Sequence, residues 1–317
     1  MDSSMIADRR RLRRKVGFWR IVAVLLLVAL GFAAYSAFIG DVPHSRPHVA
    51  HVTISGLITD DDELLERLKK IEKSDAVKAV VVSISSPGGT TYGGERVFKA
   101  IRAIAAKKPV VSDVRTLAAS AGYMIATAGD MIIAGDSSIT GSIGVIFQYP
   151  QVKPLLDKIG VSLEEIKSSP LKAEPSPFHP ASEEAKAMIN NMIVDSYGWF
   201  VDLVAERRKL PRDEVQKLAD GTIFTGRQAL KAKLIDQIGG DDEIRAYLET
   251  RKVSKSLPEV DWNKRRSTPF LLADSASQIL TLLGYDNLAK ARDLGGILPQ
   301  KLLLDGLLSV WQVGNDQ

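Results

Sequence analysis

Short apolar runs alternate with amphipathic segments through the first half of the chain. Four apolar runs have the length and composition of buried strands: 49–54, 77–84, 109–113 and 131–134. Three segments between them have helical spacing or small helix-forming residues and predict helices: 61–72, 93–106 and 123–128. Strands that alternate with helices in this way predict an α/β core.

A longer helix is predicted over residues 182–208. Ser182 suits its N-cap, and the acidic Glu183 and Glu184 suit its first turn. One stripe of its side chains is apolar, which favours core or a subunit interface over a cofactor site: Met188, Met192, Tyr197, Phe200 and Val204.

Residues 251–317 differ from the rest of the chain. A polar, basic linker is followed by apolar segments that are interrupted too often to span a membrane. We expect a mainly helical C-terminal extension that packs on the body or between subunits. Two other hypotheses stay open, namely membrane contact and a tail that reaches the active cleft.

The N-terminus combines a basic cluster with an uncharged apolar segment. Residues 1–20 carry seven basic and two acidic residues, and residues 21–39 carry no charge. As a helix, residues 21–39 would be about 28 Å long, close to the thickness of a bilayer core. The positive-inside rule then predicts a cytoplasmic tail (1–20), a transmembrane anchor (21–39) and a linker (40–47) that leads to the far side. The alternative is a cleaved signal peptide, since small residues at 33–37 offer a cleavage site.

Charge and composition exclude several classes of protein. The sequence pI is about 9.1, but beyond residue 20 the chain has 35 basic and 36 acidic residues, so a basic nucleic-acid-binding body is excluded. The chain has no cysteine, which excludes disulfides, a catalytic thiol and a cysteine-ligated metal. No motif with metal-ligand spacing or a Walker loop is present, so we expect neither a cofactor nor a metal.

The first candidate for chemistry is Ser120, which lies among the small residues of 118–122 between a predicted strand and a predicted helix. Small neighbours let a peptide backbone approach the hydroxyl. Free N–H groups at the start of a helix stabilise negative charge, which is the setting a nucleophilic serine needs. The alternative is a small-residue site for helix packing.

A second loop supports the first. The predicted strand 77–84 leads into Pro87, Gly88 and Gly89, where glycine permits backbone shapes that turn N–H groups towards a ligand. Such donors can form an oxyanion hole. A lone Pro-Gly-Gly sequence is usually only a turn, but two such loops, each after a strand of one α/β domain, favour an active site.

The base that would activate Ser120 is not decided by the residues alone. His44, His48 and His51 belong to the linker or the first strand, and His179 lies in a predicted loop. Lys172 also lies in a predicted loop, where lysines are usually exposed. A lysine serves as a base near neutral pH only when desolvation lowers its pKa to about 7–8.

Five motifs in a fixed order make the chain resemble the signal peptide peptidase SppA family of serine proteases (peptidase family S49). They are 86–89, 118–123, 140–145, the Lys172 loop and 223–230. The resemblance implies a Ser/Lys dyad and assigns these roles: Ser120 as nucleophile, Lys172 as general base, Ser142 to hold the lysine amine, the backbone N–H groups of Gly89 and Ala121 as oxyanion donors, and Gly88 to shape the turn. Ala121 stands where many relatives have glycine, and Met124 where an aromatic residue is common.

The resemblance covers residues 48–250, which we expect to form the peptidase domain on a ClpP/crotonase-like core of repeated ββα units. It implies an endopeptidase that degrades remnant signal peptides and other extended peptides and assembles into a homo-oligomeric ring or dome. With the predicted anchor, it places the domain on the periplasmic side of a bacterial inner membrane. Two alternatives remain: a crotonase-like acyl-CoA enzyme and a non-catalytic membrane scaffold.

Overall fold

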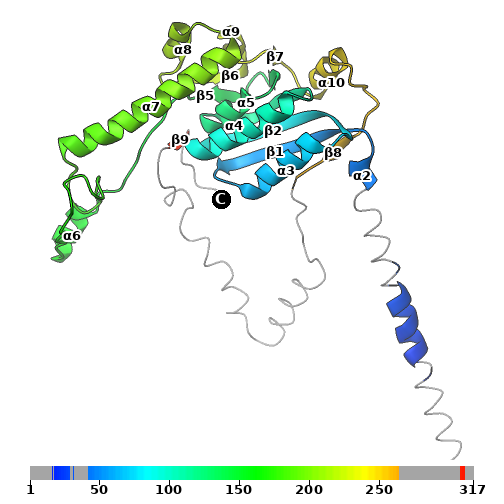
Figure 1. Ribbon diagram of the computed structural model, residues 1–317, viewed down its shortest axis with the longest axis horizontal. Coiled ribbons are helices and arrows are strands. Elements are labelled where there is room, and N and C mark those ends of the chain that lie inside the picture. Colours follow the sequence, from blue (N-terminus) through cyan, green and yellow to red (C-terminus); the bar gives the residue numbers. More distant parts are fainter. Residues whose placement is uncertain (1–15, 17, 29–30, 32–41, 264–307, 311–317) are drawn as a thin grey trace, which may run out of the picture.

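The computed structural model describes residues 16, 18–28, 31, 42–263 and 308–310 (Figure 1). Residues 18–28 are helical, and the one-turn helix α2 (Val42–Ser45) lies in the predicted linker. Among the described residues, no helix combines the length and the apolar character that a membrane crossing requires. Much of the predicted anchor, 29–30 and 32–39, lies outside these residues.

Strands and helices alternate as predicted, which confirms the α/β core. The alternating elements are β1 (His48–Ile58), α3 (Asp62–Lys73), β2 (Val77–Thr90), α4 (Thr91–Ala105), β3 (Val110–Ala119), α5 (Ala121–Ala126), β4 (Met131–Ala134) and β5 (Ile139–Gly141). Up to β4 the repeat is one strand and one helix rather than the expected ββα. A register shift interrupts β1 between Ser55 and Leu57, and another interrupts β2 between Ile84 and Ser86. Each of these long strands is therefore one strand with a bend, where the ββα pattern would have two strands.

The second half of the domain adds helices and short strands around this core. These elements are α6 (Lys153–Ile159), α7 (Glu183–Arg208), α8 (Arg212–Leu218), β6 (Ile223–Thr225), α9 (Gly226–Lys231), β7 (Gln237–Ile238), α10 (Asp241–Thr250) and β8 (Glu259–Asp261). Local hydrogen bonds mark the helix starts, since the side chain of Ser182 accepts from the Ala185 N–H at the start of α7. Asp61 does the same for α3, with Leu64 as donor.

One sheet joins the nine strands of the described residues in the order β6-β5-β3-β2-β1-β8. β4 pairs with β3 and β7, and β9 (Leu308–Val310) pairs with β2. β1, β2, β3 and β5 run parallel, so their carboxyl ends point in one direction. In such sheets ligands bind beyond those ends.

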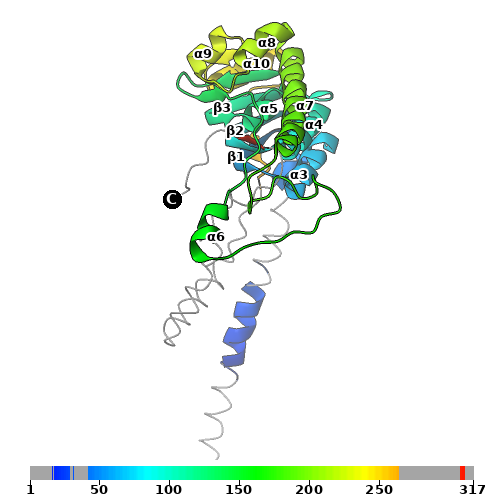
Figure 2. The same ribbon diagram turned by 90° about the vertical axis from the view of Figure 1, so that its left-hand side faces the viewer.

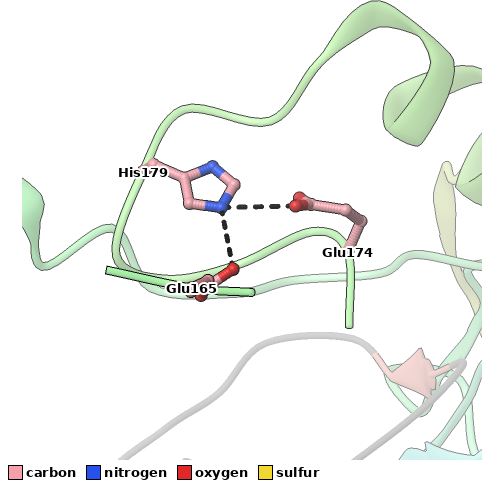
Figure 3. A group of neighbouring side chains, drawn as sticks. All are labelled: Glu165, Glu174 and His179. Atoms are coloured by element: carbon pink, nitrogen blue, oxygen red, sulfur yellow. Dashed lines mark ion pairs between the residues drawn. The ribbon is translucent and has the colours of Figure 1, made fainter. Parts of the chain in front are cut away.

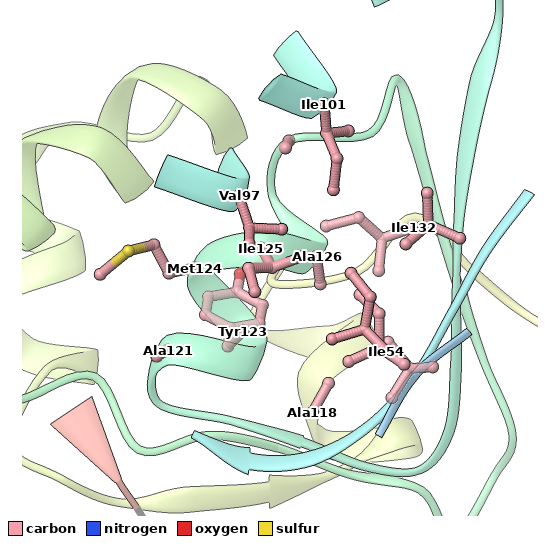
Figure 4. Packing of buried hydrophobic residues seen from close by; sticks show 14 of the residues in the cluster. Ile54, Val97, Ile101, Ala118, Ala121, Tyr123, Met124, Ile125, Ala126 and Ile132 are labelled. Carbon is pink, nitrogen blue, oxygen red and sulfur yellow. The ribbon is translucent and has the colours of Figure 1, made fainter. Parts of the chain in front are cut away.

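Both faces of the sheet are covered by helices. Alternate residues of β2 point to opposite faces: Val80 and Val82 join the larger apolar cluster with α3, α4 and α5, whereas Ala79 and Val81 join a smaller one with α10. Figure 4 shows the larger cluster around α5. This two-sided burial explains why the strands appear in the sequence as almost continuous apolar runs.

Two expectations from the sequence need correction. β2 does not end in a loop at residue 85 but continues to Thr90, because Gly88 and Gly89 still pair with Leu57 and Ile58 of β1. The described part of the C-terminal extension contains the strands β8 and β9 and no helix. The segments 264–307 and 311–317, on which the helical expectation rested, lie outside the described residues.

A pair of glycine substitutions tests the packing. A Cβ at Gly226 would lie 2.0 Å from the Gly135 carbonyl oxygen, whereas one at Gly198 in α7 would meet only Arg212 Nη2 at 3.9 Å. We expect Gly226→Ala to lower the free energy of unfolding by about 2 kcal/mol or more and Gly198→Ala to raise it by up to about 1 kcal/mol. Urea unfolding of both variants measures these changes, and equal shifts would contradict the geometry.

Candidate active site

Ser120 occupies the sharp turn between β3 and α5. Its backbone angles are φ 59° and ψ −119°, a combination that L-residues rarely adopt. The turn is held from both sides, because the Ser120 N–H donates to the Gly141 carbonyl at 2.8 Å and the Ser120 carbonyl accepts from the Met124 N–H at 2.9 Å. A strained serine on a strand-to-helix turn is the arrangement by which α/β-hydrolases present a nucleophile.

The small residues around Ser120 also pack α5 tightly against its neighbours. A Cβ at Gly122 would lie 2.9 Å from the Ser86 carbonyl oxygen, and one at Gly94 would lie 3.1 Å from Ala121 Cβ. Tyr123 next to them is fully buried (Figure 4). Its hydroxyl donates to the Leu234 carbonyl at 2.8 Å. Burial raises the pKa of Tyr123, which keeps its hydroxyl a neutral donor. The packing alternative and the nucleophile hypothesis therefore describe the same residues.

The glycine segment at the end of β2 lies beside this turn. Ser86 pairs with Ala118 of β3, two residues before Ser120. Gly88 has φ 109° and donates its N–H to Ser86 Oγ at 3.1 Å. A Cβ at Gly89 would lie 1.8 Å from the Ile58 carbonyl oxygen, so only glycine fits between β1 and the site.

Ser142 reaches the same place from β5. Ala119 pairs with Gly141, so Ser120 and Ser142 each follow a paired residue of two neighbouring parallel strands. Ser142 also has a positive φ, of 50°, and its N–H donates to the Thr222 carbonyl at 2.8 Å. The structure thus brings Ser120, Ala121, Ser142 and the two glycines together at one edge of the sheet. Their individual roles stay predictions.

Lys172 comes from a different part of the chain. It belongs to a segment that we call the arm, residues 150–181, which contains α6 and extends away from the sheet (Figures 1 and 2). The Lys172 N–H donates to the Ser169 carbonyl at 3.1 Å, but the residue is exposed, and its ammonium forms no ion pair within the described part of the chain. The desolvation that a lysine base requires must therefore come from another surface.

His179, the other candidate base, is engaged within the arm (Figure 3). Its Nε2 lies 3.2 Å from Glu174 and 3.6 Å from Glu165, and its Nδ1 lies 3.1 Å from the Pro180 carbonyl oxygen. Lys167 Nζ lies 2.5 Å from Glu165 and 2.6 Å from Glu174. The hydrogen bond from Lys167 lowers the pKa of both carboxyls. These four side chains form what we call the arm cluster.

The arm cluster is also the place where a metal ion would be sought. The ligand atoms of Glu165, Glu174 and His179 all lie within 4.8 Å of one another. Lys167 already places a positive charge against both carboxylates, so a cation would have to displace this ammonium. The residues therefore fit an ion-paired brace of the arm better than a metal site.

His48 and His51 form hydrogen bonds within the peptidase domain. His48 is buried between the Arg46 carbonyl, 2.7 Å from Nδ1, and the Trp262 indole, whose N–H donates to Nε2 at 2.9 Å. His51 contacts Ser83 Oγ at 2.9 Å, and that hydroxyl donates to the buried Asp113 at 2.8 Å.

Asp113 also lines a polar pocket of about 470 Å³ next to Arg115 and the start of α10. Sequence reasoning missed this polar chain and pocket, because Ser83 and Asp113 occur singly within apolar strands.

The comparisons with known proteins agree with this architecture. The model of peptidase family S49 matches residues 102–255, and the Clp protease model matches residues 48–134. A candidate protease of Synechocystis sp., slr0021, is 36% identical over 208 residues, which cover 65% of this chain and 75% of that protein. The chain belongs to peptidase family S49.

Two further relatives match over a similar region. A candidate protease of Methanocaldococcus jannaschii, MJ0651, is 37% identical over 193 residues, which cover 61% of this chain and 62% of that protein. A candidate signal peptide peptidase SppA of Enterococcus faecium is 35% identical over 224 residues, covering 66% and 64%. The chain thus spans less than two thirds of these two relatives. The S49 membership confirms the family predicted from the motifs, and the Clp protease match fits the predicted ClpP-like core.

The strain at Ser120 can be measured by protein stability, without an assay of catalytic activity. Ser120→Ala and Ser120→Gly both remove the hydroxyl, but only glycine relaxes at φ 59°. We expect the free energy of unfolding of Ser120→Gly to exceed that of Ser120→Ala by about 1 kcal/mol or more. Ser112, buried in β3 without a positive φ, is the matched control, where glycine should be the less stable variant. If glycine were less stable than alanine at both positions, Ser120 would be unstrained.

The arm cluster predicts a response to acid. The pKa values of Glu165 and Glu174 are lowered in the folded arm. The stability that these carboxylates give to the arm is therefore complete above the ordinary carboxyl pKa of about 4.3, and it is lost as pH falls through the lowered values. We expect hydrogen exchange of residues 165–181, corrected for its intrinsic pH dependence, to stay slow down to about pH 5 and to accelerate below about pH 4.

A substitution gives the control for the acid response. Lys167→Met should accelerate exchange in the arm already at pH 7, because two carboxylates then face each other without their cation. Lys186→Met, which breaks the exposed pair with Glu183 in α7, should leave the arm unchanged. Equal exchange in the wild type and Lys167→Met would rule out the cluster as the brace of the arm.

Proposed function

We propose that this protein is a serine endopeptidase with a Ser/Lys dyad that degrades remnant signal peptides and other extended peptides. The observation that carries the proposal is the strained Ser120 at the junction of β3 and α5, with the Gly88–Gly89 edge on one side and Ser142 on the other. Membership of a peptidase family supports the reaction class.

In the proposed mechanism, the Ser120 hydroxyl attacks the peptide carbonyl while its proton passes to neutral Lys172 Nζ. The carbonyl oxygen becomes an oxyanion that accepts hydrogen bonds from the N–H groups of Gly89 and Ala121. Ala121 is the first residue of α5, so its N–H has no acceptor within the helix. The C–N bond then breaks, and the leaving amine takes the proton from Lys172.

An ester between Ser120 and the acyl part of the substrate remains. Water attacks this ester while Lys172 accepts a proton, and the collapse of the second tetrahedral intermediate returns that proton to Ser120 Oγ. In this proposal Ser142 orients the lysine amine. The proposed domain spans residues 48–250, and no cofactor enters any step.

As a base, Lys172 needs a surface that desolvates its amine. We propose that a second copy of the chain provides this surface. The exposed arm carries many apolar side chains, which suit a protein contact: Leu155, Ile159, Val161, Leu163, Ile166 and Phe178. A homo-oligomeric ring or dome, in which each arm lies against a neighbour, would bury these groups and restrict entry to extended chains.

We also propose that the N-terminal segment anchors the protein in a bacterial inner membrane by a single pass. The basic residues of 1–20 and the uncharged stretch 21–39 support this topology. The peptidase domain would then lie on the periplasmic side, next to the apolar peptides that remain in the membrane after secretion.

The dyad is tested by hydrolysis of a synthetic signal peptide. Ser120→Ala and Lys172→Ala should each reduce kcat by about 10³-fold or more, because one lacks the nucleophile and the other the base. Ser142→Ala should reduce kcat by about 10-fold or more and shift the pH profile. His179→Ala is the control and should retain activity, since both of its ring nitrogens are engaged within the arm.

Mixed oligomers decide where the base comes from. If Lys172 acts on the Ser120 of another copy, mixing the two inactive variants restores part of the activity, because some sites then contain both native residues. Active Lys172→Ala with inactive His179→Ala would identify His179 as the base. A folded wild type that neither cleaves peptides nor reacts with an acylating probe would contradict the proposal, and coenzyme A binding would then favour the crotonase alternative.

A further inference from the structure

The outer edge of β1 is covered over only part of its length within the described residues. β8 pairs with residues 49–51 of β1. Just beyond β8, the Trp262 N–H donates to the His51 carbonyl at 2.9 Å, and the Thr53 N–H donates to Asn263 Oδ1 at 2.7 Å. The backbone groups of His51 and Thr53 therefore face outwards, and the alternation of a strand turns those of Ser55 the same way. The edge of β1 beyond Thr53 is a place where another strand can pair.

A pocket of about 220 Å³ lies between this part of β1 and the helix α3. The β1 side contributes residues 53–55 and 57–59, and α3 with its N-cap contributes Asp61, Leu64 and Arg67. A spacing of three places these side chains of α3 on one face of the helix. The pocket is smaller than the sites of about 300–1,000 Å³ that hold drug-sized ligands, so it suits a single side chain or a chain end.

Arg67 brings an unpaired positive charge to this pocket. Its side chain is half-buried, and its Nε is a buried donor with no hydrogen-bond partner among the described residues. Nearby carboxylates are engaged elsewhere, because Asp60 and Asp62 both pair with Arg96. A buried guanidinium donor without an acceptor is unfavourable, so an acceptor that enters from outside is stabilised there.

We propose that this pocket and the adjoining edge of β1 bind an extended peptide that presents a carboxylate to Arg67. The peptide backbone pairs with β1 beyond Thr53, and the guanidinium holds the carboxylate by charge-assisted hydrogen bonds. The carboxylate belongs to an acidic side chain or to the end of a chain, since both offer the same two oxygens. The site goes beyond the proposed function, because β1 and β3, which leads to Ser120, lie on opposite sides of β2.

The charges in the pocket determine how the peptide lies. The Asp61 carboxylate accepts the Leu64 N–H at 2.9 Å, and its negative charge disfavours a second carboxylate at that end. Arg67, at the other end of the row on α3, attracts it. The buried side chains of Leu64, Ile58 and Val97 also line the pocket and suit the aliphatic stem of an acidic residue. A phosphate could use the arginine but would leave the strand edge unpaired.

The experiment measures peptide binding to the full chain with Ser120→Ala, in which the probes stay intact. Three acetylated probes share the sequence Thr-Val-Thr-Val: one continues with Glu and an amidated end, one ends there in a free carboxylate, and one continues with Gln and an amidated end. We expect at least one of the first two to bind about tenfold or more tightly than the Gln probe. The tighter of the two identifies the source of the carboxylate.

A matched pair of variants assigns the effect to Arg67. Arg67→Met keeps most of the aliphatic stem and should abolish the preference for the carboxylate probes. Lys69→Met removes the same charge from an exposed position of α3 and should retain the preference. Because Arg67 Nε has no partner in the unbound protein, Arg67→Met should leave the thermal midpoint unchanged or raise it.

Hydrogen exchange locates the bound backbone. A carboxylate probe should slow exchange of the Ser55 amide, which faces the open edge, and leave that of Val52, which faces β2, unchanged. Equal affinities of the three probes, a preference that persists in Arg67→Met, or unaltered exchange at Ser55 would each overturn the inference. Arg67-dependent binding of inorganic phosphate or of phosphatidylglycerol vesicles, without slower exchange at Ser55, would show a phosphate site instead. A lower thermal midpoint of Arg67→Met with unchanged binding would show a purely structural arginine.

Discussion

The parallel pairing of β2, β3 and β5 is the constraint on which the candidate site depends. Parallel strands end at the same side of a sheet, so the residues that follow each strand meet there. Ala118 lies opposite Ser86 and Ala119 opposite Gly141, and these two pairings bring the glycine segment, Ser120 and Ser142 together. A shift of one residue in either register would turn the strand faces over and separate these groups.

Tight packing around α5 maintains the unusual backbone at Ser120. The turn is fixed by one hydrogen bond to Gly141 and by a helix whose side chains are all buried. Strain of this kind persists only where the surroundings determine the backbone more strongly than local preference does. The glycines and alanines near Ser120 therefore serve two purposes, close packing of α5 and access of a peptide to the hydroxyl.

The rigid sheet and the arm differ in how they are held. The sheet is held by strand pairing and two apolar clusters, whereas the described contacts within the arm include the ion pairs of Lys167 and the hydrogen bonds of Gln151 to Ser176 and His179. Lys172 lies on the arm, and β9 lies on the strand edge beside Ser120. In the proposed enzyme, catalysis then requires that a second copy of the chain desolvate Lys172.

The sequence by itself determined the alternation of strands and helices, the cap at Ser182, and Ser120 with its glycine partner segment as the candidate site. These features depend on local periodicity and on hydrogen bonds between residues close in the chain. Only the tertiary structure decided that β2 runs on through Gly89, that β9 joins it, and that Lys172 lies on an exposed arm. The physical reason is that strand pairing and loop position depend on partners distant in sequence, and a local pattern contains no information about which distant backbone will satisfy its N–H and C=O groups.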